Sequence, residues 1–154
     1  MVLCIVTGMT GGPAGHAYAG QTKDYFLRMI KPAAQDFEIA RDLLQKQDKF
    51  SADNGEFDNP DQFQVARVVL GDDGMEEIVF TVWSTMCGTV GCSFVIARHE
   101  ANGWRLIGEG GLKLEFGVVV LARTDHGYHR LRGAGREDTV WTGSEYRVLP
   151  RKAH

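Results

Sequence analysis

The chain has 154 residues, of which 44% are hydrophobic and 24% charged, and its formal net charge is −3. This size and composition are typical of one globular domain that buries a core without help from disulfides or metals. The mildly acidic balance argues against a nucleic-acid-binding surface, which needs clustered lysine and arginine. Most of the 19 glycines follow residue 70, which predicts tight turns between short strands.

Residues 1–19 contain no Asp, Glu, Lys or Arg. An apolar stretch, Val2 to Met9, leads into small residues that end in Ala17-Tyr18-Ala19, the A-x-A form of a signal-peptidase site. We predict a signal peptide that is cleaved near Ala19, giving a periplasmic or secreted protein. Because the usual positive segment is missing, we expect the true start to lie upstream of Met1. The alternative is a disordered or buried N-terminal segment.

Residues 20–50 have a helical pattern. One apolar stripe is formed by Phe26, Ile30, Ala33, Phe37, Ala40 and Leu44. Pro32 interrupts the stripe, which predicts a kink or a second helix that starts near this residue. We expect the stripe to pack on a sheet, and a partner-binding face is the alternative.

A polar loop is predicted over residues 51–63. It carries an acidic cluster of Asp53, Glu56, Asp58 and Asp61, whose spacing fits no EF-hand loop. We therefore interpret this segment as a solvated linker.

Residues 64–150 read as an antiparallel β region of the same domain. About seven short strands are expected near residues 64–70, 76–83, 92–99, 103–110, 114–123 and 126–133, and in a hairpin over residues 138–149. The acidic turn at residues 71–74 is predicted to be a type I′-like hairpin turn with a solvated tip. The predicted fold class is α+β, with the N-terminal helical segment packed on this mostly antiparallel sheet.

Cys87 and Cys92 flank the tip of a predicted hairpin, where paired residues lie at the Cα separation that a disulfide tolerates. Gly88 and Gly91 relieve the backbone of so small a ring. The spacing fits neither a zinc knuckle nor a C-x-x-C redox pair. We predict a structural disulfide, with free buried thiols as the alternative. Like the signal peptide, a disulfide requires an oxidising compartment.

Residues in the β region also form a pattern in which an acidic turn, a strand, a cysteine hairpin and a Gly-Trp pair follow each other. Its positions are Leu70, Asp73, Gly74, Glu77, Cys87, Gly88, Gly91, Cys92, Gly103 and Trp104, followed by Gly127, Tyr128, Leu131, Trp141, Gly143 and Tyr146. The pattern resembles the D-x-N-G-D-G-like turn and C-G-S-G-G-C-like cysteine hairpin of a family of small exported bacterial proteins. The resemblance implies a secreted, periplasmic or lipid-anchored location rather than a particular activity.

In that family the acidic turn looks like a degenerate calcium loop. Here Asp72 and Asp73 remain, but Val69 and Gly71 stand at the two earlier ligand positions. A loop without those donors lacks the six to eight oxygens that calcium takes, so no metal site is predicted.

No nucleophile elbow, metalloprotease motif, P-loop or dinucleotide fingerprint occurs. His99, His126 and His129 are interpreted as surface residues, because His126 and His129 would point to opposite faces of a strand. Glu109 and Glu115 are a candidate carboxylate pair.

The aromatic residues Trp83, Tyr128, Trp141 and Tyr146 are the candidate binding residues. We expect most of them to fill the core, and one or two near turns to anchor a partner. Residues 141–146 also resemble the S-G-x-x-Y loop of periplasmic lysozyme inhibitors, with Thr142 in the serine position.

The sequence therefore predicts an exported periplasmic protein that acts as a non-catalytic binding or inhibitor-like module. The alternatives are a cell-envelope enzyme with carboxylate or histidine chemistry, and a structural accessory domain. We expect no cofactor, no nucleic acid and no transmembrane segment, and a partner that is another protein or a cell-envelope component.

Overall fold

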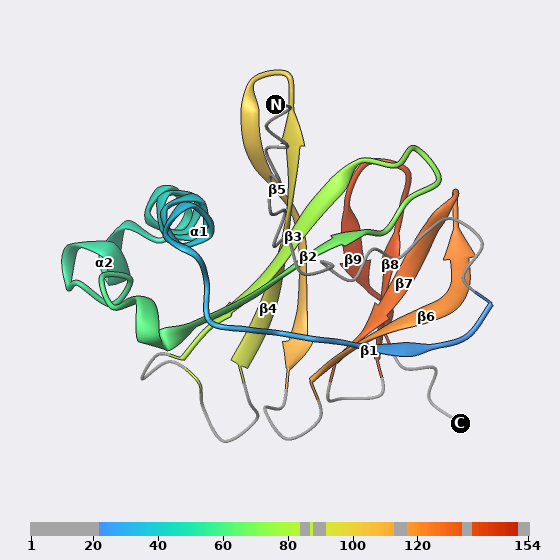
Figure 1. Ribbon diagram of the computed structural model, residues 1–154, viewed down its shortest axis with the longest axis horizontal. Helices are drawn as coiled ribbons and strands as arrows, with labels where there is room; N and C mark the ends of the chain where they lie inside the picture. The colour runs from blue at the N-terminus through green and yellow to red at the C-terminus, as the bar shows by residue number, and fades with distance from the viewer. Residues whose placement is uncertain (1–21, 84–86, 88–91, 113–116, 134–136, 151–154) are drawn as a thin grey trace, which may run out of the picture.

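Nine strands of one mixed sheet dominate the computed structural model, which describes residues 22–83, 87, 92–112, 117–133 and 137–150 (Figure 1). The predicted signal peptide lies outside these residues. The elements in chain order are β1 (Tyr25–Leu27), α1 (Ala34–Gln47), α2 (Lys49–Asp53), a 3-10 turn (Pro60–Gln62), β2 (Phe63–Val69), β3 (Glu76–Val82), β4 (Cys92–Glu100), β5 (Gly103–Leu112), β6 (Val118–Asp125), β7 (Tyr128–Arg132), β8 (Asp138–Trp141) and β9 (Tyr146–Val148).

The sheet is nearly closed into a barrel. Its strand order is β1-β6-β7-β8-β9-β5-β4-β3-β2, and every pair is antiparallel except β5 with β9. The two ends meet because Ile30, just after β1, forms a bridge with Val65 of β2 through backbone N–O distances of 2.9 and 2.8 Å. The end strands β1 and β2 thus meet at this bridge, which covers part of the edge that an open sheet would expose.

The predicted α+β class is therefore wrong, as is the expectation of about seven antiparallel strands beside an N-terminal helical segment. Tyr25–Leu27 is a strand that pairs with β6, and Phe26 and Ile30 are exposed rather than part of a buried helical stripe. The apolar spacing of so short a segment fits a helical period of about 3.6 residues and a strand period of 2 equally well. Pro32 separates this segment from the helix that follows. Pairing with a strand about ninety residues away, at Val118–Val120, then decides its conformation.

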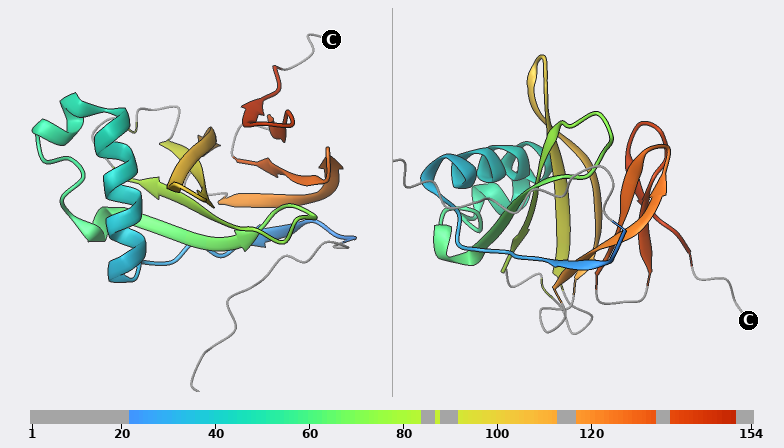
Figure 2. Two further views of the ribbon diagram at one scale, coloured as in Figure 1. Left: turned by 90° about the horizontal axis from the view of Figure 1, so that it is seen from above. Right: turned by 45° about the vertical axis from the view of Figure 1, so that its right-hand side comes forward.

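Helix α1 covers the outer face of β2, β3 and β4 (Figure 2). Its buried side chains pack on a cluster that includes Phe63, Val65, Ile78, Phe80 and Val95, and Phe37 meets Phe63 edge-on at 5.1 Å. Asp36 in its first turn and Lys46 in its last turn complement the helix dipole. Neither α1 nor α2 has the length and hydropathy that a bilayer-spanning helix requires.

Within the predicted loop over residues 51–63, the structure adds the end of α2 and the 3-10 turn. Asp48 caps α2 by accepting a hydrogen bond from the backbone N–H of Ser51. This cap holds α2 beside the C-terminal end of α1.

Strand β3 is buried on both faces. Ile78 and Phe80 face α1, whereas Val79 belongs to a second cluster that fills the barrel together with side chains from β1, β2 and β4 to β9. Alternate side chains of a strand point to opposite faces, so Glu77 and Thr81 share the interior face with Val79. A charged residue is thus placed inside the barrel.

Gly108 marks the single bridge between β5 and β9. A Cβ atom added there would lie 2.4 Å from the Cβ of Tyr146 and 2.6 Å from its backbone oxygen. Backbone cannot yield as a flexible side chain can, so only glycine allows the strands to approach this closely.

We predict that Gly108→Ala lowers the free energy of unfolding by about 3 kcal/mol, the upper end of typical overpacking effects. The matched control is Gly111→Ala, because an added Cβ at this position meets no atom within 4 Å. The control should change stability by less than about 0.5 kcal/mol. Chemical denaturation measures both, and equal losses would contradict the close β5–β9 approach.

Candidate functional site

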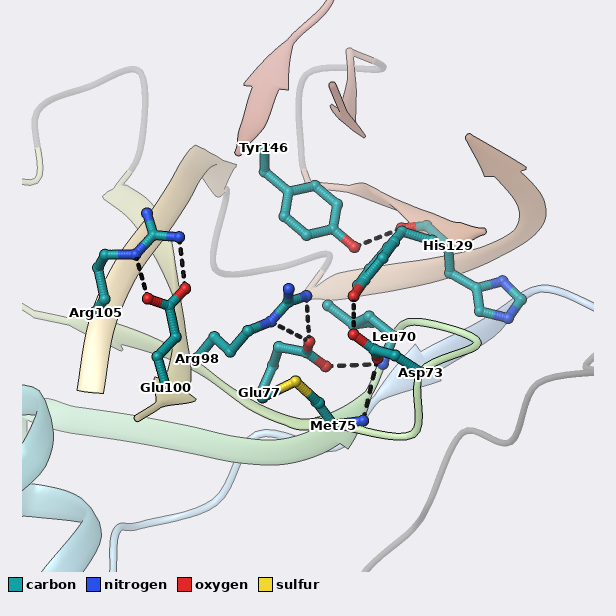
Figure 3. A network of polar contacts seen from close by, with 10 residues as sticks. Leu70, Asp73, Met75, Glu77, Arg98, Glu100, Arg105, His129 and Tyr146 are labelled. Carbon is teal, nitrogen blue, oxygen red and sulfur yellow. Dashed lines mark hydrogen bonds and ion pairs between the residues drawn. The ribbon is translucent and has the colours of Figure 1, made fainter. Parts of the chain in front are cut away.

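The barrel interior holds a buried ion pair between Glu77 of β3 and Arg98 of β4 (Figure 3). Arg98 donates to Glu77 Oε1 from Nε at 3.0 Å and from Nη2 at 2.7 Å. Glu77 Oε2 accepts from the backbone N–H of Leu70 at 2.9 Å. Both carboxylate oxygens are thus hydrogen-bonded, as a buried charge requires.

Three of the four predicted binding aromatics surround this pair. The guanidinium of Arg98 lies 4.7 Å from the ring centre of Tyr128 and 4.9 Å from that of Trp141, and Trp141 packs on Tyr146 at 5.2 Å. All three rings are buried, so they form the core and are not available to a partner. Trp83 is 42% exposed and remains a candidate surface residue.

Burial controls the ionisation of these groups. Removal from water raises the pKa of Glu77, although its hydrogen bonds to Leu70 and Arg98 oppose that rise. Burial, together with a hydrogen bond to Asp73, raises the pKa of Tyr128 to about 12. Tyr128 therefore stays neutral at physiological pH and donates its O–H to Asp73.

The acidic turn at residues 71–74 differs from the predicted type I′ geometry. That type needs positive φ at both central residues, but Asp72 and Asp73 have negative φ and only Gly74 is positive, at 70°. Asp73 accepts hydrogen bonds from Tyr128 and from the backbone N–H of Met75, so its tip is tied to the barrel rather than simply solvated. In the described residues, no group of three or more His, Cys, Asp or Glu side chains is arranged to hold a metal.

The histidines lie apart. His126 and Gly127 both have positive φ and form the two-residue turn between β6 and β7. His129 is buried, contrary to the prediction of a surface residue, and its Nδ1 lies 2.7 Å from the carbonyl oxygen of Leu121. This contact requires the proton on Nδ1. His99 packs against Trp104 at 5.3 Å.

The predicted disulfide between Cys87 and Cys92 is present, with a Cα–Cα distance of 4.5 Å. It ties the chain after β3 to the first residue of β4. A loop this short gives an entropic stabilisation of about 2 kcal/mol. The disulfide therefore acts as a local constraint on a domain that already has a core.

A cleft of about 470 Å³ lies between the disulfide and the two helices. Val82, Ser93, Val95 and Glu109 line it from the outer face of the sheet, together with both cysteines.

The opposite wall of this cleft comes from the helical segment. Leu44 and Gln47 belong to the last turns of α1, and Ser51 belongs to α2. Glu56 and Phe57 come from the loop that follows α2. We call this site the disulfide cleft.

The charges of the disulfide cleft are all negative. Asp48, Glu56 and Glu109 line it, and no lysine or arginine does so among the described residues. Hydrogen bonds from the backbone and side chain of Ser51 hold the pKa of Asp48 below its usual value. Glu56 Oε2 is buried and meets no hydrogen-bond donor in the described part of the chain. A carboxylate oxygen that is buried without a donor is unfavourable, so Glu56 gains from a rearrangement that gives this oxygen a donor.

A second cleft, of about 370 Å³, lies beside Arg67, His99 and Trp104. Arg67 donates to Asp36 at 2.6 Å and forms an ion pair with Glu76. Because its charges are already paired within the protein, this cleft offers less to a ligand than the disulfide cleft does.

Ser51 has no histidine beside it in the described lining of the disulfide cleft. A serine nucleophile needs such a base. The hydroxyl of Ser51 instead donates to Asp48 at 2.9 Å. Of the predicted carboxylate pair, Glu109 lies here, and Glu115 lies outside the described residues.

Sequence reasoning named Glu56 and Glu109 but did not connect them. It also missed Asp48 and Phe57 as residues of one site. The helix-capping pattern Asp48-x-x-Ser51 was the available signal, since a cap fixes where the helix turns. Nothing local indicates that this turn faces the disulfide.

Comparisons with models of protein families, with curated proteins and with solved structures find no match. The resemblance to small exported bacterial proteins therefore stays a prediction. The geometry of the described residues carries the functional argument.

We predict that Arg98→Met lowers the free energy of unfolding by about 3–5 kcal/mol, because it leaves the charge of Glu77 buried and unpaired. The double variant Glu77→Gln/Arg98→Met should be more stable than Arg98→Met, since the amide oxygen can still accept from Leu70. Urea denaturation measures both. A double variant less stable than the single variant would contradict the role of the pair.

The loss of folding stability that Arg98→Met causes should also become larger as pH rises. Without Arg98, the pKa of Glu77 lies further above the unfolded value near 4.5, so the folded state binds the extra proton. Stability then falls as pH rises through the interval between the two pKa values. Measurements at about pH 5 and pH 8 test this sign, and a deficit independent of pH would argue against it.

Proposed function

We propose that this protein is an exported, non-catalytic binding module whose ligand site is the disulfide cleft. The observation that carries the proposal is the cleft itself, whose described lining combines apolar walls with three carboxylates and contains no histidine, lysine or arginine. Binding pockets combine apolar walls with a few polar groups in this way. A protein or cell-envelope component is the proposed partner.

The disulfide supports export. Disulfides persist in oxidising compartments and are rare in the cytosol. Both cysteines line the cleft, so the same bond also stiffens the sheet side of the proposed site. A cytosolic form would lose this constraint.

The two alternatives make different demands on the cleft. An envelope enzyme would need one of the carboxylates to act on a bound substrate, and a purely structural domain would leave the cleft without a ligand. The core position of Tyr128, Trp141 and Tyr146 favours binding at the cleft over binding through an aromatic patch.

Export predicts a defined mass for the protein recovered from the organism that makes it. We expect a chain that lacks residues up to Ala19 and takes up two alkyl groups only after reduction, because the third cysteine, Cys4, is removed. Intact mass spectrometry with and without reduction measures this. Three alkyl groups without reduction would contradict an oxidising compartment.

Selection from a displayed library of random peptides tests the binding site. We expect enriched peptides to bind the oxidised protein and to lose binding to Ser93→Trp, which fills the cleft from an exposed strand position. Thr124→Trp, at an exposed position of β6, is the matched control and should bind as the parent does. Peptides that bind both variants equally, or no enrichment, would argue against this site.

A further inference from the structure

We infer that the disulfide cleft accepts a basic side chain, lysine or arginine, presented by a partner protein. This inference rests on the proposed function and adds the chemical class of the ligand. It is carried by the charges, the apolar surface and the unpaired carboxylate oxygen of the cleft.

Charge complementarity is the first argument. Three carboxylates line the cleft, and the described lining contains no positive group to neutralise them. Asp48 keeps its charge at neutral pH, because hydrogen bonds from Ser51 lower its pKa. A phosphate or carboxylate ligand would be repelled, whereas an ammonium or guanidinium would be attracted.

The apolar surface of the cleft is the second argument. Leu44, Phe57, Val82 and Val95 contribute apolar surface next to the carboxylates. The side chains of lysine and arginine match this surface, because each has an aliphatic stem that packs on apolar groups and a charged end that stays with polar groups. A small inorganic cation would gain nothing from these apolar walls.

Glu56 is the third argument. Its Oε2 is buried and has no donor in the described part of the chain, although its backbone N–H bonds to Ser51. A cationic N–H donor would supply the missing hydrogen bond, which is stronger when the partners are charged. Because this oxygen is shielded from solvent, Glu56 has to turn it toward the cleft when the ligand's charged end binds.

A set of capped tripeptides tests the inference. Ac-Gly-Lys-Gly-NH2 and Ac-Gly-Arg-Gly-NH2 carry the cation, and Ac-Gly-Nle-Gly-NH2 has the same aliphatic stem without charge. Titration to about 10 mM, followed by amide chemical shifts, detects millimolar binding. We expect the two basic peptides to shift Ser51 and Ser93, and the norleucine peptide to bind about ten-fold more weakly.

Variants separate ligand binding from folding. Glu56→Gln should weaken the lysine peptide about five-fold or more while leaving stability unchanged or higher, because it removes a carboxylate oxygen that is buried without a donor. Glu109→Gln should also weaken binding. Glu137→Gln removes the same charge at an exposed position next to β8 and should leave binding unchanged.

Two results would overturn the inference. Equal binding of the norleucine peptide would show that charge is not recognised, and absence of shifts in the cleft with both basic peptides would show that the cleft does not accept them. Neither result would contradict the proposed function, which the peptide selection tests separately. That selection can still enrich neutral or acidic peptides whose binding is lost in Ser93→Trp. Selected peptides that bind at the cleft but lack lysine and arginine would support the proposed function and contradict the inference of a basic ligand.

Discussion

The ion pair of Glu77 and Arg98 inside the barrel is the interaction around which the rest of this structure is arranged. A carboxylate and a guanidinium removed from water must satisfy each other and find further hydrogen bonds. The second oxygen of Glu77 holds the backbone N–H of Leu70, which fixes the start of the acidic turn. The guanidinium of Arg98 lies beside both Tyr128 and Trp141, whose rings pack on each other at 4.6 Å, and these contacts join β7 and β8 to β4.

Because the pair and its aromatic neighbours fill the interior, the outer surface carries the proposed site. Helix α1 covers the sheet only as far as Gln47, where Asp48 starts the next helix. The outer face of β3, β4 and β5 continues past this point to the disulfide. The cleft lies where the covering helix stops, so helix length and the capping residue decide its position. Strands β3, β4 and β5 form one wall of the cleft, and the end of α1, α2 and the loop with Glu56 and Phe57 form the other.

Local patterns predicted several parts of the molecule correctly. The hairpin over residues 142–145 and the Cys87–Cys92 pair follow from turn chemistry and from the geometry of paired strands, which act over a few residues. The errors concern non-local choices. Tyr25–Leu27 became a strand because β6 offers a pairing edge, and His129 became buried because β7 lies over the carbonyl of Leu121. The predicted binding residues Tyr128 and Trp141 are buried because they pack on each other and on Arg98, contacts that no spacing in the sequence expresses.

The sequence by itself determined which segments after residue 60 extend, where tight turns fall and which two cysteines can be joined, because these depend on neighbours along the chain. Only the tertiary structure decided that the sheet closes, that Glu77 meets Arg98, and that Asp48, Glu56 and Glu109 share one cleft. The three carboxylates lie on a helix cap, a loop and a strand up to 61 positions apart in the chain. Contacts over such separations depend on the strand order and on packing of the helix, and neither follows from periodicity.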